Sequence, residues 1–140
     1  MATKADFTEA EWDNLHKGAT GSGMLVSLSD RGFTDTFKES SALAKHLAAA
    51  RTNSTSLLVR DIAATHGTGF GVTSKPAAVE SGTMDALRAS VATLQAKAPD
   101  ELEAYRAFVL ELAEAVSAAA KGGDEAEAAA IAKIREALGA

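Results

Sequence analysis

Three acidic residues lie close together early in the chain. Asp30, Asp35 and Glu39 fall within ten positions, with Thr34 and Thr36 between them. If one helix ends at Asp30 and another begins soon after it, the turn between them folds these carboxylates toward a common point. Ligands that are all oxygens favour calcium, magnesium or manganese. The sequence therefore predicts a divalent-metal site at Asp30 and Glu39, with Asp35 as a third ligand.

The spacing of these acids is not that of an EF-hand. Counted from Asp30, the third and sixth positions are Gly32 and Asp35, where an EF-hand needs a ligand and a glycine. Thr36 and Glu39 also match a capping box, in which the two side chains satisfy backbone N–H groups at a helix start. Both interpretations stay open, because a carboxylate can cap a helix and coordinate a metal.

A second acidic turn lies near the end of the chain and contains Asp124, Glu125 and Glu127. Glu127 is the counterpart of Glu39 and is the fourth candidate ligand. No acidic residue stands where the counterpart of Asp30 would fall, so we expect this turn to bind metal less well than the first.

The other residue types that carry chemistry form no recognisable motif. His16, His46 and His66 are far apart, and the chain has no cysteine. The glycine-rich stretches 18–23 and 66–71 lack the Lys-Ser or Lys-Thr of a phosphate-binding loop. Serines are plentiful, but no strand precedes a turn that would strain one into a nucleophile. The sequence predicts a protein that is not an enzyme.

The elements that must position these residues are helical. Alanine is abundant, aromatic residues make up 5% of the chain, and runs of β-branched residues are missing, which favours helices over strands. Apolar spacing predicts six helices in one all-α domain over residues 7–140, after a flexible leader at 1–6. The helices are expected at 7–29, from 34–36 to 51, after a cap at 52–54, around 84–94, from 99 to 121, and at 124–138.

Three local features refine this outline. Thr8 and Glu11 match a capping box at the start of the first helix. Gly18, Gly21 and Gly23 either break that helix or let another helix approach it closely. Pro76 is expected to start a separate short turn before the fourth helix.

The charge and hydropathy of the chain limit its expected binding partners and its expected cellular compartment. The net charge is −5 and the basic residues are scattered, so nucleic acid is not an expected partner. No apolar run approaches the ~20 residues needed to span a bilayer, and the first residues do not form a signal peptide. We therefore expect a cytoplasmic protein that does not insert into a membrane.

The two ends of the chain resemble each other. Val26-Ser27 followed by Gly32 aligns with Val116-Ser117 followed by Gly122, and residues 39–45 align with 127–133 after two residues are lost from the turn. Each copy is a long helix, an acidic turn and a second helix. The sequence thus predicts two related helical halves rather than a plain up-down bundle.

The chain resembles the TerB-like tellurite-resistance family. The matching residues are Phe7-Thr8-Glu9-Ala10-Glu11-Trp12, the turn Ser29-Asp30-Arg31-Gly32 with Glu39, Tyr105-Arg106-Ala107-Phe108 with Ala113, Val116 and Ala119, and finally Ile131, Ile134, Leu138 and Gly139. They follow the family's order over nearly the whole chain. The resemblance implies an all-α fold of two related halves, a role in bacterial tellurite resistance and stress response, and acidic residues that hold metal ions.

Three functions follow from the residues and the resemblance together. The first is a non-enzymatic stress-resistance module that binds a divalent cation at Asp30, Asp35 and Glu39 and acts through protein partners. The alternative is a purely structural interaction domain in which these acids only cap helices. The third is a hydrolase that uses a carboxylate-bound metal, for which the sequence offers no recognisable base. Metal titration separates the structural domain from the other two, because only they predict a response to the ion.

Overall fold

The computed structural model describes residues 4–29, 36–54, 56–65, 76–119 and 125–139. Six α-helices lie in these ranges: α1 (Glu9–Ser29), α2 (Thr36–Asn53), α3 (Leu57–Ala64), α4 (Pro76–Lys97), α5 (Leu102–Ala119) and α6 (Glu125–Leu138). One-turn 3-10 helices, Lys4–Asp6 and Pro99–Glu101, precede α1 and α5. The described ranges contain no strand, so the predicted all-α fold of about six helices is confirmed.

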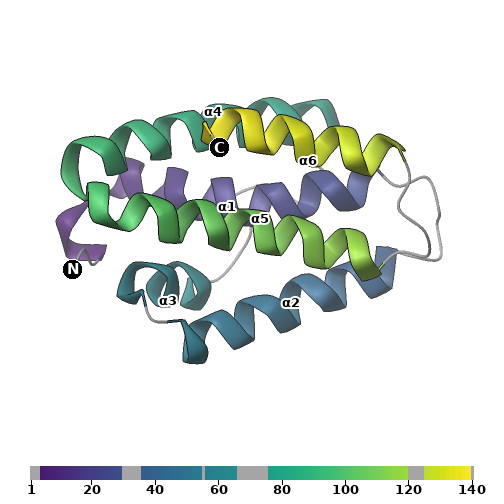
Figure 1. Cartoon of the computed structure of the whole chain (residues 1–140), viewed down its shortest axis with the longest axis horizontal. Coiled ribbons are helices and arrows are strands. Elements are labelled where there is room, and N and C mark those ends of the chain that lie inside the picture. The colour runs from purple at the N-terminus through teal and green to yellow at the C-terminus, as the bar shows by residue number, and fades with distance from the viewer. Residues whose placement is uncertain (1–3, 30–35, 55, 66–75, 120–124, 140) are drawn as a thin grey trace.

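The helices are arranged in three layers (Figure 1). The middle layer is α1 beside α5; α4 and α6 lie on one side of it, and α2 with α3 on the other. The helix pairs that pack most extensively are α1 with α4 and α1 with α5. The hydrophobic core therefore runs along the middle layer, where both central helices are covered by neighbours.

The two helix pairs are arranged as an internal duplication predicts. α1 and α5 run in the same direction, and α2 and α6 both return antiparallel to them (Figure 1). α2 packs mainly on α5, whereas α6 makes its most extensive contacts with α1. Each half therefore places its second helix on the first helix of the other half, which favours the pseudo-twofold arrangement inferred from the sequence.

The glycines of α1 allow close packing and do not break the helix. A Cβ atom placed on Gly18 would lie 2.7 Å from the Tyr105 hydroxyl oxygen and 2.9 Å from Leu87 Cδ2. The Tyr105 hydroxyl donates to the Leu15 backbone carbonyl at 2.8 Å. Burial raises the pKa of Tyr105 above its usual range, so the hydroxyl remains a donor. Gly18 thus sits where α1 meets both α4 and α5.

The apolar face predicted for the fifth helix forms the centre of the core. Tyr105, Val109, Leu112 and Val116 are fully buried, and they pack among side chains from α1, α4 and α6. At ~25 cal/mol per Å² of apolar area removed from water, burial of this kind is the main force that holds the helices together.

Two predicted boundaries were wrong. The cap of α3 is Ser56, whose Oγ accepts from the Val59 N–H at 3.2 Å, because α2 continues through Asn53 past the expected cap at 52–54. Pro76 does not start a separate turn. It is the first residue of α4, a position where the missing N–H of proline costs nothing.

The start of α1 follows the prediction. The Thr8 N–H donates to Glu11 Oε1 at 2.8 Å and the Glu11 N–H donates to Thr8 Oγ1 at 3.1 Å, which confirms the capping box. In the segment expected to be a flexible leader, Lys4 lies over the Trp12 ring at 5.7 Å.

Among the described residues, no helix combines the length and apolar character that crossing a membrane requires.

Candidate functional site

The predicted metal ligands fall where the structure gives no side-chain positions. Asp30 and Asp35 lie outside the described residues. Glu39 belongs to α2 and Glu127 to α6, but their side chains are outside the described set. In the part of the chain that is described, no three His, Cys, Asp or Glu residues gather in a way that could hold an ion. The metal site at Asp30, Asp35, Glu39 and Glu127 therefore stays a prediction.

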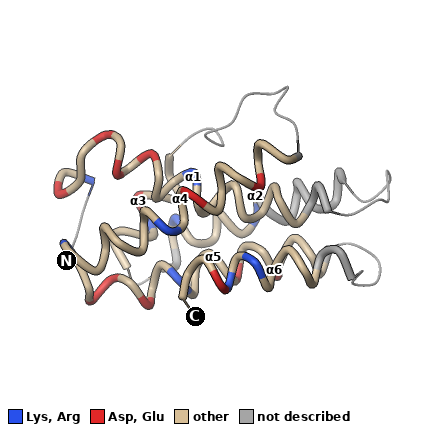
Figure 2. The backbone as a smooth tube through the Cα atoms, turned by 90° about the horizontal axis from the view of Figure 1, so that it is seen from above, with Lys and Arg blue, Asp and Glu red and all other residues tan. Residues whose placement is uncertain are grey.

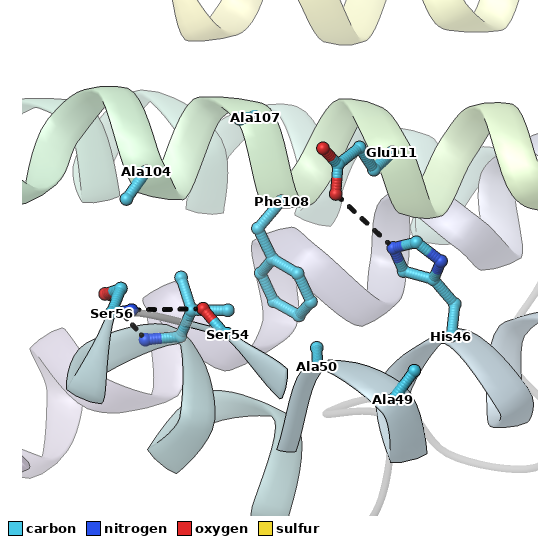
Figure 3. Close-up of a pocket in the computed structure, with 10 residues that line it drawn as sticks. His46, Ala49, Ala50, Ser54, Ser56, Ala104, Ala107, Phe108 and Glu111 are labelled. Atoms are coloured by element: carbon cyan, nitrogen blue, oxygen red, sulfur yellow. Dashed lines mark hydrogen bonds and ion pairs between the residues drawn. The ribbon is translucent and has the colours of Figure 1, made fainter. Parts of the chain in front are cut away.

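A groove lies between α2, α3 and α5 (Figure 3). Its volume is about 420 Å³, within the ~300–1,000 Å³ typical of ligand pockets. The residues that line it are His46, Ala49, Ala50, Ser54, Ser56, Val59, Ala104, Ala107, Phe108 and Glu111. We call it the α2–α5 groove.

The floor of the α2–α5 groove is apolar. The Phe108 ring points from α5 toward α2, and Ala50 faces it from the opposite wall (Figure 3). Ala49 and Ala107 line the groove and are exposed. Because alanine ends at Cβ, the two helix backbones are lined by short side chains, and the space between them is left open.

One end of the groove holds a histidine and a carboxylate. His46 Nε2 lies 3.6 Å from Glu111 Oε2, across the gap between α2 and α5 (Figure 3). This separation is too long for a hydrogen bond, and the pair is ionic only when the imidazole is protonated. The Glu111 side chain is 64% exposed, so its oxygens can accept bonds from another molecule.

The other end of the groove is closed by hydrogen bonds. The Ser56 hydroxyl donates to the buried Glu101 carboxylate at 2.7 Å and accepts from the Val59 N–H. Arg60 Nε donates to the Ser54 carbonyl at 2.5 Å, and the Ser56 N–H donates to Ser54 Oγ. The bond to Glu101 ties the start of α3 to the 3-10 helix that precedes α5, and the other bonds order the link between α2 and α3.

The groove exists because α3 is short. α3 has 8 residues and packs mainly on α2, with few contacts to α5. On the other side of the middle layer, α4 has 22 residues and lies along α1 and against α6. Part of α5 beside α3, at Ala107 and Glu111, is therefore exposed among the described residues.

The internal alignment relates this open face to a closed one. The offset that aligns Val26 with Val116 also aligns Gly18 with Phe108, and Gly18 is where α4 touches α1. The offset of residues 39–45 places His46, Ala49 and Ala50 opposite Ile134, Ala137 and Leu138, which are all buried. The α2 positions of the groove, which are half-buried or exposed, thus correspond to positions that are buried in the other half.

Charges around the groove differ between its two walls. Lys45 stands one helical turn before Ala49 on α2 and is exposed, and no described carboxylate pairs with it. Its counterpart in the other half, Lys133, pairs with Glu80 of α4 at 2.6 Å. Acidic and basic positions are otherwise mixed along the helices (Figure 2). The exposed base Lys45 therefore flanks the α2 wall without lining the groove, and the α5 wall carries the acid Glu111.

The sequence contained few signs of the groove. In the sequence His46 belongs to no motif, and Phe108 is one of several apolar residues in its helix, so neither predicts a site. The alanines that leave the space open are indistinguishable from the many other alanines of the chain. Only the separation of α2 and α5 in space turns them into a groove.

Comparisons with known proteins identify no family for this chain. No protein-family model matches it, and no curated protein and no solved structure was found to be similar to it.

Proposed function

We propose that this chain is a TerB-like, non-enzymatic stress-response module that acts by binding a protein partner in the α2–α5 groove. The observation that carries the proposal is a groove of about 420 Å³ lined by both apolar and polar side chains, open on the surface although the corresponding positions of α6 are buried. Concave sites with an apolar base and a few polar groups are where proteins commonly bind other molecules.

The groups in the groove favour binding over catalysis. His46 with Glu111 resembles a base with a carboxylate that orients it, but a nucleophile must stand within hydrogen-bond reach of the base. The hydroxyls that line the groove are those of Ser54 and Ser56, about two helical turns along from His46. The Ser56 hydroxyl is also engaged with Glu101. The pair is therefore better suited to contacting a partner than to activating a nucleophile.

A photo-crosslinker tests this docking site directly. Benzoylphenylalanine is placed at Ala107, which lines the groove, and at Ala132, an alanine of α6 that is also exposed and serves as the matched control. After irradiation in the host cell, we expect one discrete protein adduct from position 107 and none from position 132. Filling the groove with Ala49→Leu is expected to remove the adduct. Adducts of equal yield at both positions, or an adduct insensitive to Ala49→Leu, would reject the site.

The metal-binding part of the proposal rests on the sequence and the TerB-like resemblance. α1 ends at Ser29 and α2 begins at Thr36, so Asp30 and Asp35 fall in the connection between them and Glu39 in the first turn of α2. A cation bound there by carboxylates would couple the ends of the two helices.

Calorimetric titration with calcium, magnesium, manganese and zinc tests the ion site, with thermal melts alongside. An ion at 100 times its dissociation constant stabilises a fold by ~2.7 kcal/mol. We expect a rise in Tm that is lost in the double variant Asp30→Asn with Glu39→Gln and retained in Glu127→Gln. An unchanged melt with every ion would leave only the protein-binding function.

The role in stress resistance is tested in cells. Deletion of the gene is expected to lower growth in the presence of tellurite, and a copy carrying Ala107→Leu is expected to fail to restore it. Full rescue by that variant would separate the stress role from the groove.

A further inference from the structure

We propose that the occupant of the α2–α5 groove is an amphipathic α-helix of the partner protein, with a basic residue beside α5 and an acidic residue beside α2. This inference rests on the proposed docking function and specifies the chemistry of the partner.

The closed side of the molecule indicates a helical occupant. α4 lies along α1 at Gly18, and the internal alignment places Phe108 of α5 at the corresponding position. Phe108 itself is buried, but Ala107 and Glu111 of α5 are exposed, because α3 is too short to lie along the rest of that helix. A helix laid in the groove would therefore occupy on α5 the place that α4 occupies on α1.

The dimensions of the groove agree with a helix. Along α5 its lining runs from Ala104 to Glu111, about 10 Å at ~1.5 Å per residue, which equals two helical turns. An amphipathic helix presents anchors at positions i, i+3 or i+4, and i+7 over the same length. Short side chains at Ala49 and Ala107 let a partner backbone come close to both walls.

The charges beside the groove predict which charged residues the partner helix carries on its two flanks. Glu111 is 64% exposed, and its described partner is an imidazole at 3.6 Å, so a Lys or Arg of the partner would form a stronger charge pair. On the opposite wall, Lys45 corresponds to Lys133, whose partner Glu80 belongs to α4. A partner helix with an acidic residue beside α2 would reproduce that pair at Lys45.

A designed peptide tests the inference. The probe is a 14-residue, fluorescently labelled helix with Leu at i, i+3, i+4 and i+7, Lys along one flank and Glu along the other. Binding to the full chain is followed by fluorescence anisotropy. We expect each of Glu111→Lys and Lys45→Glu to weaken binding by about fivefold, since each turns an attraction between exposed groups into a repulsion.

The double variant Lys45→Glu with Glu111→Lys provides the decisive comparison. Its groove again has one basic and one acidic wall, so the peptide can bind after turning end to end, and affinity is expected to return to within about twofold of the wild type. Glu114→Lys is the matched control, because Glu114 is 58% exposed on the same helix but pairs with Arg135 of α6. It is expected to leave binding unchanged.

The outcomes separate this inference from the docking function. Peptide binding that is lost in Ala107→Leu but indifferent to all charge variants would keep the groove as a docking site and reject the charged flanks. No peptide binding, together with a discrete crosslink at position 107, would reject the helical occupant alone. A dimer in sedimentation of the chain by itself, abolished by Ala107→Leu, would show that a second copy fills the groove and would overturn the inference.

Discussion

The two central helices, α1 and α5, are equivalent by the internal alignment but are covered to different extents. α4 lies along α1 and contacts α6, whereas α3 has 8 residues and leaves part of α5 open (Figure 1). We call these the closed side and the open side. The closed side combines Gly18, Leu87 and Tyr105 in close contact, and the open side is lined by alanines. The difference suggests that one copy of the repeat serves stability and the other serves binding.

The two sides are expected to differ most in how much free energy of unfolding is lost when a leucine is replaced by alanine. Leu87 of α4 is fully buried, and Leu87→Ala is expected to lower the free energy of unfolding by about 2–5 kcal/mol through lost transfer energy and a cavity. Leu47 of α2 is only partly buried, so Leu47→Ala is expected to cost about 1 kcal/mol. Urea denaturation measures both. Equal losses would contradict a tightly packed closed side.

A methyl group added at Gly18 tests the contact between α1 and α4. Gly18→Ala is expected to lower the unfolding free energy by about 1–3 kcal/mol, because the new Cβ would overlap Tyr105 and Leu87. Gly82 of α4 is the control, since it is only half-buried and Gly82→Ala is expected to stabilise by up to ~1 kcal/mol through helix propensity. Stabilisation by both substitutions would show that α1 and α4 are less closely packed.

Removing the Tyr105 hydroxyl separates hydrogen bonding from packing on the closed side. Tyr105→Phe keeps the ring and loses the bond to the Leu15 carbonyl, for an expected cost of about 0.5–1.5 kcal/mol in urea denaturation. A loss as large as that of Leu87→Ala would mean that the hydrogen bond, rather than the apolar contacts, holds α5 to α1.

A larger side chain on the open side is expected to be tolerated. Ala107 is exposed in the groove, so Ala107→Leu is expected to change the unfolding free energy by no more than about 0.5 kcal/mol. The contrast with Gly18→Ala is direct, because both substitutions add bulk to a central helix. A loss above 1 kcal/mol would show that the groove is closed in solution.

The smallest expected effect is a change in pH dependence at the edge of the closed side. A hydrogen bond from Lys97 of α4, together with the Thr8 backbone N–H, lowers the pKa of Glu11 from its usual 4.5. The folded state therefore gains stability from the carboxylate above that pH and loses it as the pH falls through the lowered pKa. Thermal melts between about pH 5 and 3 should fall less steeply for Glu11→Gln than for the wild type. Parallel curves would mean that the pair contributes nothing.

Periodic features of the sequence predicted the helices well. Apolar spacing placed α1, α5 and α6 within a few residues of their observed bounds, because a helix with a buried face repeats its apolar residues every three to four positions. One error lies where Ser, Thr and Asn occur together at 52–56, since several of these residues could cap a helix, and the other lies at Pro76, the first residue of α4. The expectation of one long helix through Gly18 is confirmed, but only the structure shows which side chains approach the helix there.

The amino-acid pattern by itself determined the helical class, the core face of α5, the capping box at Thr8 and the resemblance between the two halves. Those properties depend on neighbours within a few turns of chain or on direct comparison of segments. Only the tertiary structure decided that α4 covers α1 while α3 leaves α5 open, and that His46 meets Glu111 across the gap. The reason is physical: a groove is a space between elements distant in sequence, and its size depends on how they pack rather than on the preference of any one residue.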